Sequence, residues 1–170
     1  MGVREPAPLD YPQPLMPFLG RKVTLHTGAD TPPVGCWVKP VQTKAWPAQR
    51  IAPDLRAPGP GPFWSSEHLD MRAEFRVYVL GRAAAGAGRY DDGEDNVVYD
   101  QGVVDAMISA YALSGQAPAA YALDVAVLAD GRTVLVEVTD AWAIGYYRGT
   151  LSARDYVRFL WVRWTELTRR

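Results

Sequence analysis

The amino-acid sequence predicts an α+β domain with a mostly antiparallel sheet flanked by helices. Two stretches, residues 73–80 and 122–139, alternate apolar and polar side chains with the period of two that is typical of strands. Two others, residues 100–114 and 152–167, carry apolar side chains at the spacing of an amphipathic helix. The second alternating stretch has Asp130-Gly131 at its centre, which favours a hairpin between antiparallel strands.

The composition is that of one globular domain with a sizeable core, with or without a small appendage. Of the 170 residues, 48% are hydrophobic and 22% are charged, and the formal net charge of −1 argues against a nucleic-acid partner. Cys36 is the single cysteine, so no internal disulfide forms and no oxidising compartment is implied. No stretch approaches the ~20 apolar residues of a membrane span. We expect a cytoplasmic protein that binds neither nucleic acid nor membrane.

The first part of the chain combines Pro-rich segments with short strands. Residues 1–20 are a Pro-rich N-terminal extension, which we expect to be extended, and residues 21–170 form the domain. Strands are predicted near residues 22–25 and 35–41. Residues 47–62 are too rich in proline and glycine for a helix or a central strand, and a loop of this length is usually functional or disordered.

The strand at residues 73–80 has two chemically different faces. Its core face is formed by Ala73, Phe75, Val77 and Val79, and its polar face by Glu74, Arg76 and Tyr78. Residues 83–90 are expected to return as a glycine-interrupted strand. An acidic loop follows, for which we expect full solvation, with Asp91, Asp92, Glu94 and Asp95.

Capping signals delimit the two predicted helices. The first ends before Gly115, a helix stop signal. The second opens with Ser152-Ala153-Arg154-Asp155, which is similar to a capping box, and carries one apolar stripe formed by Val157, Leu160, Trp161, Trp164 and Leu167. For the tryptophans, we expect packing in the core or at its rim at positions 46, 64, 142, 161 and 164.

The hairpin brings two carboxylates together. A two-residue type I′ turn at Asp130-Gly131 pairs Ala129 with Arg132, and counting outward pairs Asp124 with Glu137. The opposite face is then apolar throughout, with Leu123, Val125, Val127, Val134, Val136 and Val138. Like charges ~5 Å apart across a sheet destabilise it, and a divalent cation with oxygen ligands would relieve the repulsion. The alternative is that both acids are solvated on an exposed face. The small side chains of Ala122, Ala126 and Thr139 around them favour the cation.

Basic side chains complete a pattern with these acids. The predicted strands carry Lys39, Arg76 and Arg89, and Lys44 follows the strand that contains Lys39. Lysines, arginines and paired acids on strands suit a nucleotide phosphate chain that is held with Mg²⁺. The sequence has neither the glycine-lysine loop nor the dinucleotide glycine fingerprint of the common nucleotide-binding folds.

The order of these motifs resembles that of the ATP-grasp superfamily, and the chain is most similar to the clade named for two arginines and one lysine, whose members are like carboxylate–amine ligases. The resemblance covers roughly residues 35–165. It is carried by Trp37-Val38-Lys39-Pro40, Lys44-Ala45-Trp46, Ser66-Glu67, Glu74-Phe75-Arg76, Leu123-Asp124-Val125 and Val136-Glu137-Val138-Thr139-Asp140.

The resemblance implies a role for each matched residue and the cofactors ATP and Mg²⁺. Lys39 and Lys44 would contact the ATP phosphates, and Glu67 would lie near adenine and ribose. Arg76 would approach the transferred phosphate, with Arg89 as the candidate for the second arginine. The metal ligands would be Asp124, Glu137 and Thr139. In such ligases ATP phosphorylates a carboxylate, and an amine then attacks the acyl phosphate.

Two departures from the family pattern bear on catalysis. The family usually has Glu-x-Asn where this chain has Glu137-Val138-Thr139, and threonine offers a hydroxyl in place of an amide oxygen. The consequences to weigh are weaker metal binding, a bridging water, or recruitment of Asp140. Full ATP-grasp enzymes also carry an N-terminal domain, whereas 38 residues precede Lys39 here. A homodimer that completes the site and a loss of catalysis are both alternatives.

The sequence therefore leads to two main hypotheses. The first is an ATP- and Mg²⁺-dependent ligase that joins a small-molecule or peptide carboxylate to an amine through an acyl phosphate. The second is a non-catalytic or partner-dependent nucleotide-binding protein derived from the same fold. A plain binding domain would leave the Asp124–Glu137 pair without an explanation. On the first reading, Asp124→Asn or Glu137→Gln should abolish Mg·ATP binding and leave the fold intact or slightly more stable.

Overall fold

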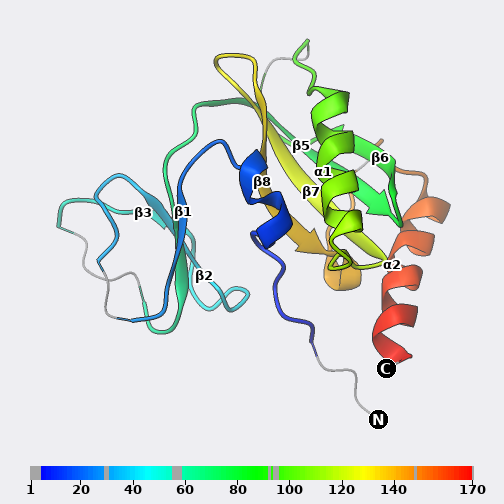
Figure 1. Ribbon diagram of the computed structural model, residues 1–170, viewed down its shortest axis with the longest axis horizontal. Coiled ribbons are helices and arrows are strands. Elements are labelled where there is room, and N and C mark those ends of the chain that lie inside the picture. The colour runs from blue at the N-terminus through cyan, green and yellow to red at the C-terminus, as the bar shows by residue number, and fades with distance from the viewer. Residues whose placement is uncertain are drawn as a thin grey trace. The chain divides into compact units, whose positions relative to one another are not determined.

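Two four-stranded antiparallel sheets form the framework of the protein, which is described here from a computed structural model (Figure 1). The structure describes residues 5–28, 31–54, 59–91, 93, 96–147 and 149–169. The chain divides into two compact units, a larger one of Met1–Phe18 with Met71–Arg170 and a smaller one of Leu19–Asp70. The predicted α+β class with mostly antiparallel pairing is confirmed.

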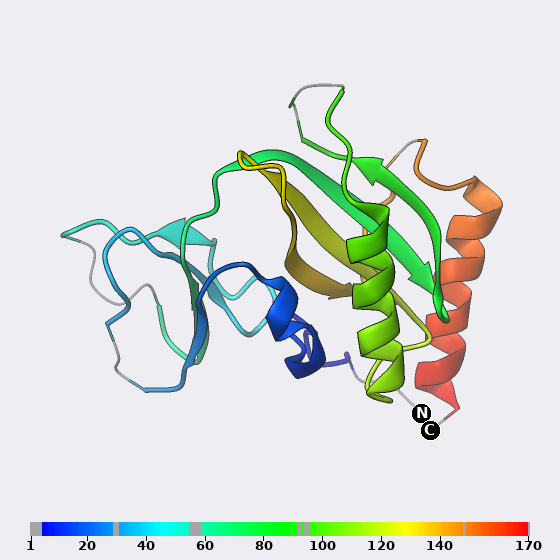
Figure 2. The same cartoon turned by 45° about the horizontal axis from the view of Figure 1, so that its top comes forward.

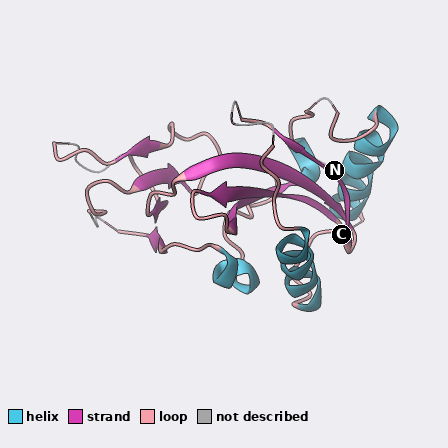
Figure 3. Ribbon diagram, turned by 90° about the horizontal axis from the view of Figure 1, so that it is seen from above, coloured by secondary structure: helices cyan, strands magenta, loops and turns pink. Residues whose placement is uncertain are grey.

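The larger unit contains one sheet with helices on both faces. In sheet order its strands are β6 (Ala83–Arg89), β5 (Met71–Leu80), β7 (Ala120–Leu128) and β8 (Thr133–Asp140). The helices are η1 (Gln13–Phe18), α1 (Gln101–Leu113), η2 (Ala141–Ala143) and α2 (Ala153–Thr168). Figure 3 shows η1 and α1 on one side of this sheet and α2 on the other. None of the described helices is long and apolar enough to cross a membrane.

The central strands β5 and β7 are buried by these two layers. The apolar positions predicted for β5 are buried, and every residue of β7 is buried. On the α1 side the core includes Tyr111 and Tyr121, whose rings meet edge to face at 5.1 Å. On the α2 side Phe159 packs edge to face on Tyr78 at 5.4 Å. Polar side chains on the α2 side of β7 must therefore find partners inside the protein.

Both helices begin with a capping contact, and the one at Ser152 is predicted from the sequence. Asp100 caps α1, because its carboxylate accepts hydrogen bonds from the backbone of Gly102 and Val103. Ser152 caps α2 by accepting from the backbone N–H of Asp155. These contacts satisfy donors that a helix N-terminus leaves unpaired.

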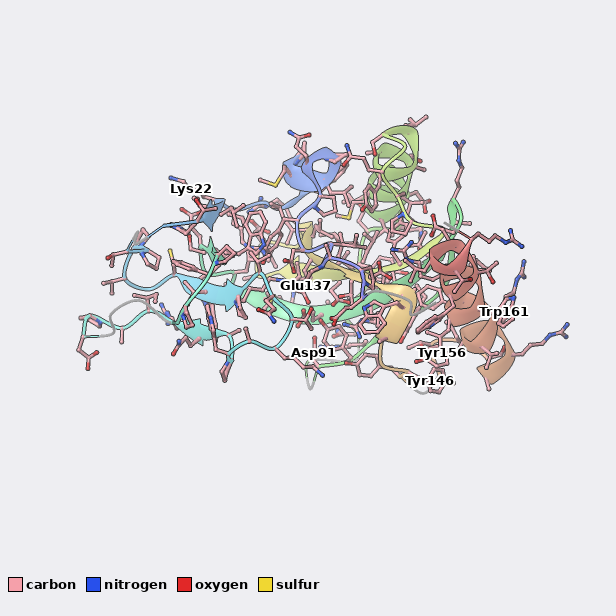
Figure 4. The ribbon with its side chains drawn as sticks, turned by 90° about the horizontal axis from the view of Figure 1, so that it is seen from below. Lys22, Asp91, Glu137, Tyr146, Tyr156 and Trp161 are labelled. Carbon is pink, nitrogen blue, oxygen red and sulfur yellow. The ribbon has the colours of Figure 1, made fainter. Side chains whose placement is uncertain are left out.

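The apolar stripe predicted for α2 faces the sheet only in part, because Leu160 packs against the core there while other members of the stripe are exposed. The residues of α2 that are buried are Phe159 and Arg163, whereas Val157 is 64% exposed and Trp161 is 70% exposed. Trp161, which is expected from the sequence in the core or at its rim, is therefore not in the core. The physical reason is that Phe159 and Arg163, four residues apart, lie one above the other and anchor the helix through Tyr78 and Asp140. Figure 4 shows Trp161 on the outer side of α2.

The other tryptophan of α2 lies at the rim, as expected. Trp164 donates a hydrogen bond from Nε1 to the Trp142 carbonyl oxygen at 2.9 Å, and their rings are 6.3 Å apart. Together with Trp161 it lines an apolar groove of about 550 Å³, whose remaining walls are Val157, Leu160, Thr165 and Thr168.

The β7–β8 hairpin reaches the predicted pairing of Asp124 with Glu137 by a different route. The turn has three residues, Ala129 to Gly131, because the Leu128 N–H donates to the Arg132 carbonyl. Gly131 has a φ of +85° and Asp130 is not among the residues with positive φ, so the predicted type I′ turn is wrong. This shifts the register by one residue. A bulge at Val136 shifts it back before Glu137.

The corrected register changes which residues share a face. Leu135, rather than Val136, lies opposite Val125, while Val134 lies opposite Ala126 on the face that carries the acids. The predicted core positions Leu123, Val125, Val127 and Val138 are buried as expected.

The N-terminal residues pack into the larger unit instead of running extended along it. The described segment contains the 3₁₀ helix η1, whose Leu15 is fully buried. Asp10 bridges to Val138, accepting a 2.8 Å hydrogen bond from its N–H. Proline tolerates these conformations because its φ of about −65° fits a 3₁₀ turn.

The smaller unit is a sheet around a small core. In sheet order its strands are β1 (Val23–His26), β4 (Phe63–Ser66), β2 (Trp37–Pro40) and β3 (Gln49–Arg50). Strands β1 and β2 lie where they are predicted, and β4 is not predicted. The Pro/Gly-rich segment contributes only the two-residue edge strand β3 among its described residues, which agrees with its exclusion as a central strand. Val38, Ile51 and Phe63 form the core, with Trp46 against it.

The different exposure of Phe159 and Trp161 on α2 predicts that substituting them lowers the free energy of unfolding by different amounts. Phe159→Ala should lower the free energy of unfolding by about 3–5 kcal/mol, because it opens a cavity under Tyr78. Trp161→Ser should change it by no more than ~0.5 kcal/mol, because that side chain is exposed. Urea unfolding of both variants is the measurement. A large loss for Trp161→Ser would mean that another surface covers α2.

Candidate functional site

Three charged side chains form a row across the α2-side face of the larger sheet. In the strand register Asp124 of β7 lies directly opposite Arg76 of β5 and directly opposite Glu137 of β8. Directly opposed residues in antiparallel strands share a face. The predicted juxtaposition of Asp124 and Glu137 is therefore present, and Arg76 joins it. We call these three residues the charged row.

Asp124 is buried and held by an arginine. Its exposed fraction is 1%, which rules out the reading in which this acid is solvated. Arg76 donates from Nε to Oδ1 and from Nη2 to Oδ2, each at 2.7 Å. Burial lowers the pKa of Arg76, but the hydrogen bonds and charge of Asp124 outweigh burial and raise it above its ordinary value. The repulsion between the two acids is thus offset by a guanidinium.

Two tyrosine rings contact the same guanidinium. Tyr90 and Tyr147 stack with their centroids 5.2 Å apart and their planes 18° apart. The Cζ atom of Arg76 lies 5.3 Å from the Tyr90 centroid and 5.2 Å from the Tyr147 centroid, within the range of cation–π contact. We call Tyr90 and Tyr147 the tyrosine pair. The sequence analysis selected neither tyrosine as a site residue.

Glycines in β6 let the segment that carries Tyr147 approach the sheet. Gly88 lies opposite Arg76, and Gly86 lies opposite Tyr78. A Cβ atom on Gly88 would come within 2.1 Å of Thr150 Cγ2, and one on Gly86 within 2.2 Å of the Thr150 carbonyl oxygen. Glycine inside a strand is a recognised sign of close backbone approach, so this contact had a signal in the sequence.

Glu74 extends the negative charge of the face. The Tyr90 hydroxyl donates a hydrogen bond to its Oε1. Burial raises the pKa of Glu74, the Tyr90 hydrogen bond opposes this, and the charges of Asp124, Glu137 and Asp91 raise it further. Glu74 thus adds an acid to the two acids of the charged row.

Asp124 and Glu137 are the residues of the charged row that could hold a magnesium ion shared with phosphates. Among the described residues no group of three or more His, Cys, Asp or Glu side chains is arranged to hold a metal ion. Mg²⁺, however, commonly takes one or two carboxylates and completes its shell with substrate phosphates and water. Asp124 and Glu137, directly opposed, supply two such carboxylates. Thr139 lies two residues beyond Glu137 and opposite Ala122.

Asp140 is engaged elsewhere and does not join the charged row. Arg163 of α2 donates from Nε to Oδ1 at 2.9 Å and from Nη2 to Oδ2 at 2.6 Å. Asp140 also caps η2 by accepting from the Trp142 N–H at 2.9 Å. In the register it pairs with Tyr121, which points to the opposite face of the sheet from Asp124. Its recruitment as a substitute metal ligand is therefore not supported.

Arg89 is not brought to the charged row either. It lies opposite Phe75, on the other face of the sheet from Arg76. Its Nε donates to Asp91 Oδ1 at 2.7 Å, and its Nη2 donates to the Arg72 carbonyl at 3.3 Å.

Asp91 is hydrogen-bonded rather than merely solvated. Besides Arg89 it accepts from the backbone N–H groups of Glu74 and Gly93. Burial raises its pKa, but these hydrogen bonds outweigh burial and lower it below the ordinary value. The remaining acids of the predicted loop, Asp92, Glu94 and Asp95, lie outside the described residues.

Lys39, Lys44 and Glu67 belong to the smaller unit. Lys39 is on β2, opposite Trp64 of β4. Lys44 follows β2 with a φ of +57°, a left-handed conformation that few non-glycine residues adopt. Glu67 follows β4 and accepts a 2.9 Å hydrogen bond at Oε2 from the Lys22 N–H.

The fold of the chain is similar to that of several solved structures, among them proteins described as ATP-grasp. The chain aligns with the ATP-grasp ligase PsnB complexed with minimal precursor at a TM-score of 0.52 and 21% identity, over 76% of this chain and 47% of that one. It aligns with an ATP-grasp RimK domain protein from Sphaerobacter thermophilus DSM 20745 at 0.54 and 16%, over 84% and 60%. For N5-carboxyaminoimidazole ribonucleotide synthetase from Thermotoga maritima the values are 0.50 and 10%, over 83% and 44%.

These likenesses concern the fold, and the chain spans about half the length of the PsnB structure. No curated protein is significantly similar to it. Residues 18–158 match an ATP-grasp domain family, the second family of the clade named for two arginines and one lysine, which is the clade that the sequence motifs resemble. The match includes residues of both units and the whole charged row. The chain therefore belongs to this clade of ATP-grasp domains.

Proposed function

We propose that this protein binds Mg·ATP, phosphorylates a carboxylate and joins the resulting acyl phosphate to an amine. The observation that carries the proposal is the charged row, in which an arginine and two acids from three neighbouring strands lie side by side. Membership of the ATP-grasp family supports the proposal that the protein binds ATP. The charged row supplies an arginine and two carboxylates, which are groups that bind phosphates and a metal ion.

Each member of the row has a distinct role in the proposal. Asp124 and Glu137 would hold Mg²⁺, which when bound neutralises charge on the ATP phosphates. Arg76 would bind the transferred phosphoryl group, since a planar guanidinium matches two phosphate oxygens at once. Burial on the α2 side would strengthen both interactions by limiting access of water. Catalysis on this view is positioning and charge neutralisation.

A peptide is the substrate class that we propose for the carboxylate. The support is that the ATP-grasp ligase PsnB was solved both with a minimal precursor and with precursor peptide PsnA2.

A nucleotide-binding protein without turnover is the second candidate. Thr139 favours it, because threonine replaces the amide side chain that the family usually offers to the metal. ADP release distinguishes the two candidates, since only a ligase releases ADP when acid and amine are both supplied.

Calorimetric titration of ATP tests the nucleotide site. We expect binding with Mg²⁺ and at least about tenfold weaker binding without it, because the phosphates and the two carboxylates would repel one another. Glu137→Gln should abolish the gain from Mg²⁺, so that it binds ATP about as weakly as the wild type does without the metal. Asp130→Asn, which removes an exposed carboxylate from the same hairpin, is the matched control and should bind like the wild type. Mg²⁺-independent binding, or none, would contradict the proposal.

A lysine substitution tests the contribution of the smaller unit. Lys39→Ala should weaken ATP binding by roughly tenfold or more, because a charge-assisted hydrogen bond to phosphate is worth about 1.5–3 kcal/mol. Lys22→Ala replaces another lysine of the same unit and should leave the affinity unchanged. Equal affinity for Lys39→Ala and the wild type would remove Lys39 from the site.

The Arg76 contact also revises the expected effect of Asp124→Asn on stability. Neutralising Asp124 leaves the guanidinium, whose side chain is 12% exposed, without this counter-ion. We expect the free energy of unfolding to fall by about 3 kcal/mol instead of rising. Urea unfolding measures this, with Asp130→Asn as the exposed control that should leave the midpoint in place. An unchanged or raised stability for Asp124→Asn would show that the buried pair contributes nothing net.

A further inference from the structure

Arg76 makes two kinds of contact, and only one of them competes with a metal ion. Its hydrogen bonds engage both oxygens of Asp124, at 2.7 Å each. A divalent cation that coordinates Asp124 would face this guanidinium at close range, and the two positive charges would repel each other. Loading of the metal must therefore weaken the contact between Arg76 and Asp124.

The contact with the tyrosine pair does not depend on Asp124. The ring faces of Tyr90 and Tyr147 attract a cation through their quadrupoles, whatever happens to the carboxylate. The guanidinium can therefore keep its contact with the tyrosine pair when a metal ion coordinates Asp124.

Both tyrosines are held in place by hydrogen bonds to neighbouring residues. The Tyr90 hydroxyl donates to Glu74, two residues before Arg76 on β5. Tyr147 is held through its backbone: its carbonyl accepts from Thr150 Oγ1 at 2.6 Å, and its N–H donates to the Tyr78 hydroxyl at 3.4 Å. The backbone thus fixes the place of Tyr147, and its ring contacts Tyr90 and Arg76.

We propose that Tyr90 and Tyr147 are positioning residues that hold the Arg76 guanidinium for the transferred phosphoryl group once the metal has taken Asp124. This inference rests on the proposed function. It adds that Arg76 has two successive anchors, a carboxylate in the metal-free protein and the tyrosine pair in the loaded one.

The test compares how well the protein distinguishes a nonhydrolysable ATP analogue from ADP, both titrated with Mg²⁺. The preference for the analogue reports contacts to the terminal phosphate, which is the group that Arg76 would bind. Tyr147→Leu should reduce this preference by about tenfold, because it removes one ring face from the guanidinium. Tyr147→Phe keeps the ring face and should retain the preference within about twofold.

A merely structural role for the pair gives a different result. If Tyr147 only fills space, Tyr147→Leu lowers the free energy of unfolding but leaves the preference unchanged, and that result overturns the inference. Because the hydrogen bonds that hold Tyr147 in place come from its backbone, we expect this variant to fold. Tyr90→Leu provides a second variant, and its loss of the preference, while Tyr147→Phe retains it, supports the inference in the same way.

Titration of Mn²⁺ into the nucleotide-free protein tests whether Arg76 and a metal ion compete for Asp124. Arg76→Gln should bind Mn²⁺ about tenfold more tightly than the wild type, because the competing charge is gone. Equal affinity would overturn the shared use of Asp124. If the wild type binds neither nucleotide, the proposed function itself fails, whereas wild-type binding with an unchanged preference in Tyr147→Leu overturns this inference alone.

Discussion

The burial of Asp124 is the constraint on which the polar face of the larger unit depends, because a carboxylate removed from water must find a charged or hydrogen-bonding partner. Arg76 meets this need from the neighbouring strand, and its own charge must then be accommodated. The tyrosine pair contacts the guanidinium, and the glycines of β6 allow the Tyr147 segment to lie close to the sheet. The burial of one acid thus explains the presence of Arg76 on β5, of glycines in β6 and of Tyr147 in the segment after η2.

The hairpin shows how the register of the charged row is kept. Its three-residue turn would place Glu137 out of line with Asp124, and the bulge at Val136 restores the alignment. A one-residue slip would send Glu137 to the opposite face, among the apolar residues that pack toward α1. Bulges are frequent next to functional sites because they re-aim side chains in this way.

The parts of the fold that depend on local sequence could be predicted, and the parts that depend on distant contacts could not. The position of the hairpin turn, the alternation of β5 and the cap at Ser152 are set by neighbouring residues. The orientation of α2 is decided by Asp140, 23 residues before Arg163, and the Arg76–Asp124 pair joins residues 48 apart. Side-chain pairing at such separations follows from strand order, which a single sequence does not contain. Figure 2 shows how β5 and β7, distant in the chain, lie side by side.

The arrangement around Arg76 is a poor solution if stability is its only purpose. A buried ion pair can often be replaced by apolar residues of similar volume without loss of stability. Gly86 and Gly88 weaken β6, because glycine in a strand costs roughly 0.5–1 kcal/mol relative to alanine. Glu74 and Glu137 place further negative charge near Asp124. These costs are accounted for together if the face must hold a guanidinium and a cation beside each other, as the transfer of a phosphoryl group between bound partners requires.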